Sequence, residues 1–287
     1  MLDRVFEIKQ HRFPPGYNAR VRSLRLNVEP FSVKHRPFMF YLVSYACQIT
    51  YWYRPGGKDT RRTRRAPSPI VFVHGLGGGL APFLMFIGKI LFASDQDVPI
   101  YVLDMAHLGM RLCGRAPSIP ATTRAVEAAL VRHGHRRGVF IGHSFGSAVV
   151  AHLCHQLPKR VAGVVLVDPI CFLLLDAAVA WRFVRRVPSR ASERFVEYFA
   201  SRELFTSYFI SRRFHWYHAI LWADELPPHT TVYLSESDLL VPSPQVSEYL
   251  AREGVRHHMM PGDHAHFLFR PRWENDIVAK AVEYARV

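Results

Sequence analysis

Residues 138–157, GVFIGHSFGSAVVAHLCHQL, decide the fold. The run begins as a short apolar strand and ends as an apolar helix. The residues at the joint form a G-x-S-x-G sequence made of Gly142, His143, Ser144, Phe145 and Gly146. A sharp strand-to-helix turn of this kind holds its serine in a strained backbone conformation and exposes the hydroxyl at the carboxyl edge of a parallel sheet. Ser144 is therefore the candidate nucleophile.

The chain around this turn alternates short β-branched runs with longer helical stretches, which predicts an α/β fold with a mostly parallel central sheet flanked by helices. Strands are expected at residues 69–73, 99–103, 138–142, 161–167, 230–234 and 255–260. Helices are expected at about 81–93, 120–133, 145–157, 244–253 and 273–286. Apolar residues make up 49% and charged residues 21%, a balance that excludes a disordered chain or a polytopic membrane protein.

One connection, between the strands at 161–167 and 230–234, is too long for a single crossover helix. It holds twelve aromatic residues from Trp181 to Trp222 with arginines between them, and Pro188 is the only proline before Pro227. We interpret residues 171–228 as a helical cap inserted into a core made of residues 67–170 and 229–287. Its aromatic side chains either pack within the cap or face a substrate.

A serine hydroxyl needs a base within hydrogen-bond reach and a third group to orient that base. His264, in PGDHAHFLFRP after the last expected strand, is the candidate base. Asp238, in SESDLLVP after the strand at 230–234, is the candidate acid. Three alternatives stay open, namely His266 as the base and Asp168 or Glu236 as the acid.

A glycine-rich turn, His74-Gly75-Leu76-Gly77-Gly78, follows the first of the expected strands. Backbone amides are needed near the nucleophile to stabilise the oxyanion of a tetrahedral intermediate. The amides of Phe145 and Leu76 are the candidates for this oxyanion hole. The turn lacks the lysine of a phosphate-binding P-loop, so a nucleotide site is not indicated.

Together these motifs resemble those of the α/β-hydrolase family over roughly residues 68–287. In that family an HG loop, a G-x-S-x-G elbow, an aspartate and a late G-x-H occur in this order, and Gly262 and His264 match the last of them. The resemblance implies a cap after the sixth strand of the family fold. It also implies a supporting set around the triad, namely His74, Gly75, Gly142, His143 and Gly146.

The expected activity is hydrolysis of a carboxylic ester through an acyl-enzyme on Ser144, without a cofactor. The aromatic cap favours a lipid-like substrate with a long or bulky acyl group. One alternative from a different class is a catalytically silent binding protein of the same fold. Within the enzyme class, an acyltransferase or peptidase could use the same triad. No metal site is expected, because His257 and His258 are neighbours on one strand and point to opposite faces.

The basic character of the chain is concentrated in residues 1–66, which hold fourteen Lys or Arg against four Asp or Glu. We interpret this segment as an N-terminal extension. Its RRTRR run at 61–65 lacks any nucleic-acid module, so no nucleic-acid partner is expected, whereas peripheral contact with an anionic membrane is one interpretation. The uncharged stretch 37–53 is either an interfacial helix or a segment packed on its own domain.

The chain shows no secretory signal at its start, and its four cysteines form no paired pattern. We therefore expect an intracellular protein, cytoplasmic or peripheral to a membrane. The sequence does not predict an oligomeric state.

Overall fold

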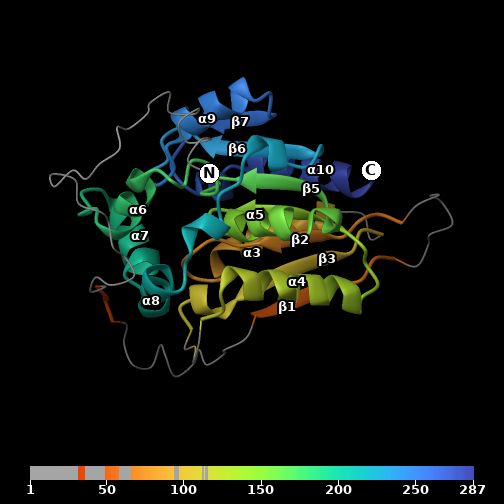
Figure 1. Cartoon of the computed structure of the whole chain (residues 1–287), viewed down its shortest axis with the longest axis horizontal. Coiled ribbons are helices and arrows are strands. Elements are labelled where there is room, and N and C mark those ends of the chain that lie inside the picture. Colours follow the sequence, from red (N-terminus) through yellow and green to blue (C-terminus); the bar gives the residue numbers. More distant parts are fainter. Residues whose placement is uncertain (1–31, 36–48, 58–65, 94–96, 112, 114–115) are drawn as a thin grey trace, which may run out of the picture.

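The computed structural model describes residues 32–35, 49–57, 66–93, 97–111, 113 and 116–287. Its centre is a seven-stranded sheet in the order β1-β3-β2-β4-β5-β6-β7 (Figure 1). All neighbouring strands are parallel except β1, which pairs antiparallel with β3. The strands are β1 (Ile49–Arg54), β2 (Ile70–Val73), β3 (Ile100–Met105), β4 (Gly138–His143), β5 (Val161–Val167), β6 (Thr230–Ser235) and β7 (His257–Met260). The predicted α/β fold is confirmed.

Helices cover both faces of the sheet, which explains why the central strands are apolar at nearly every position. Along β2, Val71 and Val73 pack into a core beneath α4 (Ile119–Arg132), α5 (Gly146–Gln156) and α9 (Ser243–Arg252). Ile70 and Phe72 point the other way, into a core beneath α3 (Leu84–Ala93) and α10 (Pro271–Ala285). Short 3-10 turns follow or precede these elements, namely η2 (Ala81–Phe83), η3 (Ala106–Leu108), η4 (Pro158–Arg160) and η8 (His266–Phe269).

Strand β1 lies at the end of the uncharged stretch 37–53, and its pairing with β3 agrees with the second interpretation of that stretch, a segment packed on its own domain. Tyr51 and Tyr53 alternate with exposed Thr50 and Trp52, as in a strand with one buried face. The Tyr53 ring stacks on His133 at a centroid distance of 3.8 Å. The sheet therefore begins at Ile49. Residues 37–48 and the RRTRR run at 61–65 lie outside the described residues.

Residues between β5 and β6 form short helices, as expected for the inserted segment. They are α6 (Ala177–Val184), α7 (Ala191–Val196), the π-helical η5 (Glu197–Ser201), α8 (Leu204–Arg212), and the turns η6 (Trp216–His218) and η7 (Ala223–Glu225). Helices α6, α7 and α8 lie beyond the end of the sheet to which β5 points (Figure 1). This is the edge at which parallel α/β sheets carry their sites. We call residues 171–228 the cap.

A short piece of the N-terminal region also contacts the cap. The backbone amide of Lys34 donates to the carbonyl of Arg202 at 2.9 Å, and its ammonium group lies 2.6 Å from Glu197. The hydroxyl of Ser207 in α8 donates to the carbonyl of Ser32. Residues 32–35 therefore pack on the cap, whereas β1 packs on the sheet.

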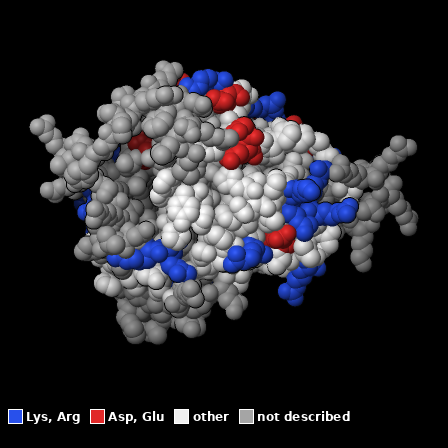
Figure 2. Space-filling model, in the orientation of Figure 1, with Lys and Arg blue, Asp and Glu red and all other residues white. Residues whose placement is uncertain are grey.

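The charged side chains do not form one continuous patch on the face that carries α4 and α5. Figure 2 shows separate groups of Lys and Arg around a largely uncharged centre. Among the described residues no helix is both long and apolar enough to span a bilayer. Cys113, Cys154 and Cys171 are buried.

Candidate active site

Ser144 lies between β4 and α5 in a left-handed backbone conformation, with φ of 50°. Such a conformation is strained for a residue with a side chain, and it aims the hydroxyl away from the sheet. The turn is tight enough that a Cβ on Gly146 would overlap the carbonyl oxygen of Val73. A Cβ on Gly142 would lie 2.9 Å from Val150. Both glycines are therefore required where the sequence has them.

The structure brings the three candidate residues into one hydrogen-bonded chain. Nε2 of His264 lies 2.9 Å from Oγ of Ser144, and Nδ1 lies 2.7 Å from Oδ2 of Asp238. Because a carboxylate only accepts, Nδ1 carries the proton when the imidazole is neutral, and Nε2 then accepts the serine hydroxyl. Serine, base and orienting acid thus have the geometry required for nucleophilic catalysis.

Backbone amides fix the acid. Oδ1 of Asp238 accepts from the amides of Leu240 and Val241 at 2.7 and 2.8 Å, which leaves Oδ2 for the histidine. Asp263 links this turn to the base, since its Oδ1 accepts from the amides of Leu239 and His264. The sequence does not predict this link. The position of Asp263 beside His264 suggests a supporting role, but its other partner, the amide of Leu239, is distant in the sequence.

Asp168, one of the two rival acids, is fully buried beside the triad without bonding to the imidazole. Its two carboxylate oxygens accept from the amides of Ser235 and Ala265, both at 2.8 Å. It therefore ties the end of β6 to the residue that follows His264. Asp168 and Ala265 are both left-handed, with φ of 44° and 62°.

The other two alternatives are placed away from the chemistry. Glu236 is exposed on the loop after β6, so it does not reach the base. His266 packs under Gly262, where a Cβ would overlap its ring, and its ring faces Phe269. His264 alone of the two late histidines bonds to Ser144.

The carboxylates around His264 favour its charged form. Burial opposes a charge on the ring, but Asp238, and more weakly Asp168 and Asp263, outweigh this and raise the pKa of His264 to about 9. Burial and the nearby Asp238 raise the pKa of Asp168 to about 6. An imidazolium that forms at His264 during a reaction is therefore stabilised in place.

The glycine-rich turn after β2 places a second amide near the serine. The amide of Gly77 is used, since it donates to the carbonyl of Leu108 at 3.1 Å. The amides of Leu76 and Phe145 donate to no other described group, and both residues line the cavity above Ser144. These are the two amides that the sequence nominated for the oxyanion hole.

His74 and His143 support the site from below. The amide of Met105 donates to Nε2 of His74, so its Nδ1–H donates to the carbonyl of Gly75 and holds the turn. Burial lowers the pKa of both histidines, which keeps them neutral. The ring of His143 lies 5.4 Å from that of His264 and packs it in place. A Cβ on Gly75 would lie 2.9 Å from Nδ1 of His143.

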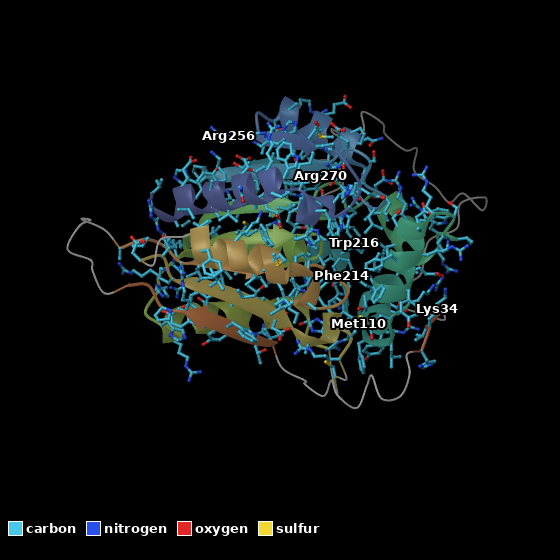
Figure 3. All side chains as sticks on the ribbon, turned by 180° about the vertical axis from the view of Figure 1, so that it is seen from behind. Lys34, Met110, Phe214, Trp216, Arg256 and Arg270 are labelled. Atoms are coloured by element: carbon cyan, nitrogen blue, oxygen red, sulfur yellow. The ribbon has the colours of Figure 1, made fainter. Side chains whose placement is uncertain are left out.

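A cavity of about 1670 Å³ opens over Ser144 between the sheet and the cap. Drug-sized ligands occupy pockets of roughly 300–1,000 Å³, so this one is large. Its walls are mainly apolar, from α3 and η8 on one side and the cap on the other. Phe214 and Trp216 lie between the cap helices and the sheet (Figure 3). Lining residues of the cap include Leu174, Val179, Ala180, Phe183, Phe195 and Phe199.

Among the described residues, the one group close enough to hold a metal ion is Asp168, Asp238 and His264. Both ring nitrogens of His264 are already hydrogen bonded, so this group suits proton transfer better than metal binding. His257 bonds to Ser247 of α9 and His258 stacks on Tyr233, which confirms that the neighbouring histidines point to opposite faces.

Residues 70–276 match the model of the Alpha/beta hydrolase family, which is well over half of the chain. The chain belongs to the α/β-hydrolase family. The match includes the elbow, the glycine-rich turn and the three residues of the hydrogen-bonded chain.

Relatives by sequence match only parts of the chain. Lipase LipV of Mycobacterium tuberculosis is 37% identical over 73 residues, which covers 25% of this chain and 28% of that protein. Abhydrolase domain-containing protein abhd-5.2 of Caenorhabditis elegans is 26% identical over 127 residues, 42% of this chain and 28% of that one. The matched regions therefore span less than a third of these relatives.

Similar folds occur in solved structures at low sequence identity. A monoacylglycerol lipase of Paleococcus ferrophilus superposes with a TM-score of 0.54 at 17% identity, over 83% of this chain and 99% of that one. A variant of the meta-cleavage product hydrolase of Pseudomonas fluorescens superposes with a TM-score of 0.58 at 15% identity, over 82% and 94%. These likenesses show the fold.

Proposed function

We propose that the protein hydrolyses carboxylic esters with a long or bulky acyl group, through an acyl-enzyme on Ser144. The observation that carries the proposal is the chain of hydrogen bonds from Ser144 through His264 to Asp238. It combines an activated nucleophile, a base and an orienting acid, which is the minimum set for acyl transfer.

In the first half-reaction, Nε2 of His264 takes the proton of the Ser144 hydroxyl as Oγ attacks the ester carbonyl carbon. The negative charge moves to the carbonyl oxygen, where the amides of Phe145 and Leu76 donate to it. The intermediate then collapses, and His264 returns its proton to the leaving alkoxide. Asp238 stabilises the transient imidazolium throughout.

In the second half-reaction a water molecule repeats these steps on the acyl-enzyme. His264 takes a proton from the water, the hydroxide attacks the acyl carbon, and Ser144 leaves with the proton held on His264. The free acid and the resting enzyme result. This chemistry needs no cofactor.

The acyl group is inferred from the cavity. Its volume exceeds that of a site for a small ester, and apolar side chains of the cap form a large part of its lining. The relative from Mycobacterium tuberculosis is a lipase by name, which agrees with a lipid-like substrate. An apolar chain extending from Ser144 beneath α6 would fill this space.

Fluorophosphonate labelling of the purified protein tests the proposal. Labelling is expected in the wild type and absent in Ser144→Ala, and strongly reduced in His264→Ala. Glu236→Gln serves as a control and should label like the wild type. A folded wild type that takes no label, or a Ser144→Ala variant that still does, would favour a silent binding protein of the same fold.

A further inference from the structure

The mouth of the cavity is lined by large apolar side chains that stay in contact with solvent. Five residues both line the cavity and remain 44–78% exposed, namely Met85, Phe195, Trp216, Tyr217 and Phe269. A side chain can satisfy both conditions only where the cavity meets the surface. We call these five residues the cavity rim.

The cavity rim is built from four separate segments. Met85 belongs to α3, Phe195 to α7, Trp216 and Tyr217 to η6, and Phe269 to η8. The rim therefore includes both the sheet side and the cap side of the cavity. Exposed apolar surface gathered in one place usually marks a contact with another molecule or a membrane.

Positive charge accompanies the rim. Arg194 directly precedes Phe195, and Arg270 directly follows Phe269. Both arginines are exposed and form no ion pair with another described residue. Figure 3 shows Arg270 on the sheet side, near the gap that separates it from the cap helices. Tryptophan, tyrosine and arginine side chains around an apolar surface are typical of proteins that bind at a bilayer interface.

Two carboxylates near the rim are paired with basic side chains of the protein. Glu193 of α7 pairs with Arg186 at 3.0 Å, and Glu274 of α10 pairs with Lys89 at 2.7 Å. The rim thus presents arginines to solvent while these two neighbouring carboxylates face partners within the protein. A surface with this balance attracts anionic head groups.

We propose that the cavity rim is the docking surface for an anionic lipid bilayer, and that the substrate enters the cavity directly from it. The route of the substrate rests on the proposed ester hydrolysis, whereas the docking itself does not. A lipid surface is favoured over a second protein copy, because a protein seated here would close the mouth that leads to Ser144, whereas a bilayer supplies apolar chains to it.

Co-sedimentation with vesicles tests the docking in the full-length chain carrying Ser144→Ala, so that no hydrolysis alters the vesicles. The probes are phosphatidylcholine vesicles with and without phosphatidylglycerol. We expect the protein to bind the anionic vesicles and to bind the neutral vesicles much more weakly. Two double variants then address the rim, Met85→Ser with Phe269→Ser and Arg194→Ser with Arg270→Ser.

The arginine pair should reduce the partition coefficient at low salt about 30-fold, equivalent to about 2 kcal/mol. The Met85→Ser, Phe269→Ser variant should reduce the partition coefficient roughly tenfold or more, because less apolar surface is buried in the bilayer interface. Matched controls are Phe92→Ser, on α3 but outside the cavity lining, and Arg256→Ser, which lies far from the cap in Figure 3. Both should bind within about twofold of the parent.

Each variant should unfold thermally with the same midpoint as the Ser144→Ala parent, which would show that it is folded. The proposal is overturned if the parent ignores anionic vesicles, if both rim variants bind as the parent does, or if the controls lose as much. Unchanged binding in the rim variants would assign membrane contact to another part of the chain, such as the basic residues 1–66. A protein that binds vesicles through the rim but takes no label at Ser144 would overturn only the proposed hydrolysis.

Discussion

The sheet and the cap differ in how firmly their residues are packed. Every residue of β2, β4, β5 and β6 is buried, whereas α6 buries only Val179 and α7 buries none of its residues. Ser144 and Asp238 follow the buried strands β4 and β6, and His264 follows the half-buried β7. Much of the cavity wall is formed by the half-exposed helices of the cap. Groups that must be held to a fraction of an ångström thus stand on the rigid part. The cap helices that line the cavity are less buried than the strands, so we expect them to open locally at a lower free energy.

The largest effect is expected at the elbow, on the sheet side of this comparison. Gly146→Ala would drive a Cβ into the carbonyl of Val73, and backbone cannot move aside cheaply. We expect a loss of about 4 kcal/mol or more in the free energy of unfolding, measured by urea denaturation. Gly88→Ala is the matched control, because a Cβ on this residue of α3 meets nothing within 4 Å. It should be neutral or stabilise by up to about 1 kcal/mol. Equal losses in the two variants would contradict the account.

The second effect concerns Asp168, which we expect to position the base without touching substrate. Asp168→Asn replaces one of the two accepting carboxylate oxygens with an amide NH₂, which would face a backbone NH donor. We therefore expect kcat/KM to fall roughly 10- to 100-fold. The reaction needs neutral His264, and the surrounding carboxylates raise its pKa to about 9, so wild-type kcat/KM should rise with pH through the neutral range. Removing the negative charge of Asp168 lowers that pKa, which moves the acid limb of the pH profile to lower pH.

A pH profile of kcat/KM with a soluble ester checks both parts of this prediction. Glu236→Gln, an exposed acid on the same loop as Asp238, is the control and should leave the profile in place. An unshifted acid limb in Asp168→Asn, with only a lower rate, would reduce Asp168 to a structural role.

The sequence predicts most of the sheet and of the site residues at the ends of its strands. The elbow is local, and the carboxyl ends of parallel strands converge, so Ser144, Asp238 and His264 could be predicted from the sequence alone. The choice between Asp238 and Asp168 was beyond the sequence, because both follow a strand at the same edge. The two aspartates differ in the direction of their carboxylates. The amides of Leu240 and Val241 orient Asp238, and the amides of Ser235 and Ala265 orient Asp168.

Strand β1 and the cavity rim were not predicted, for different reasons. The ITYWYR segment of β1 lies in an uncharged run that reads equally well as an interfacial helix, and its pairing with β3 is set by long-range contacts to His133 and His135. In the cap the aromatic residues are frequent enough to fill its core and line the cavity as well. Their count does not say which ones face solvent, because that depends on how short helices pack.

An intermediate effect is expected on the cap side. Ala180 of α6 lines the cavity, so Ala180→Glu places a charge in its apolar wall. We expect the factor by which kcat/KM falls to be roughly ten times larger for a dodecanoate ester than for an acetate ester. Ala178→Glu on the same helix does not line the cavity and serves as the control. Matching losses for both chain lengths in Ala180→Glu would place the acyl group elsewhere.

The smallest effect is expected at the far edge of the sheet. The hydroxyl of Tyr51 lies 3.2 Å from Nε2 of His133, so Tyr51→Phe should cost about 1 kcal/mol of stability. Ester turnover should not change, since β1 is at the opposite edge of the sheet from β6 and β7. Trp52→Phe, on the exposed face of the same strand, should change neither quantity. A change in turnover with Tyr51→Phe would show that the sheet edge is coupled to the site.

The most direct test of the central claim is mass spectrometry of a rapidly quenched reaction with 4-nitrophenyl dodecanoate. The account predicts a dodecanoyl group on the peptide that contains Ser144, formed before free acid accumulates and absent in Ser144→Ala. Release of dodecanoic acid without acylation of Ser144 would contradict it, as would an acyl group attached to another residue.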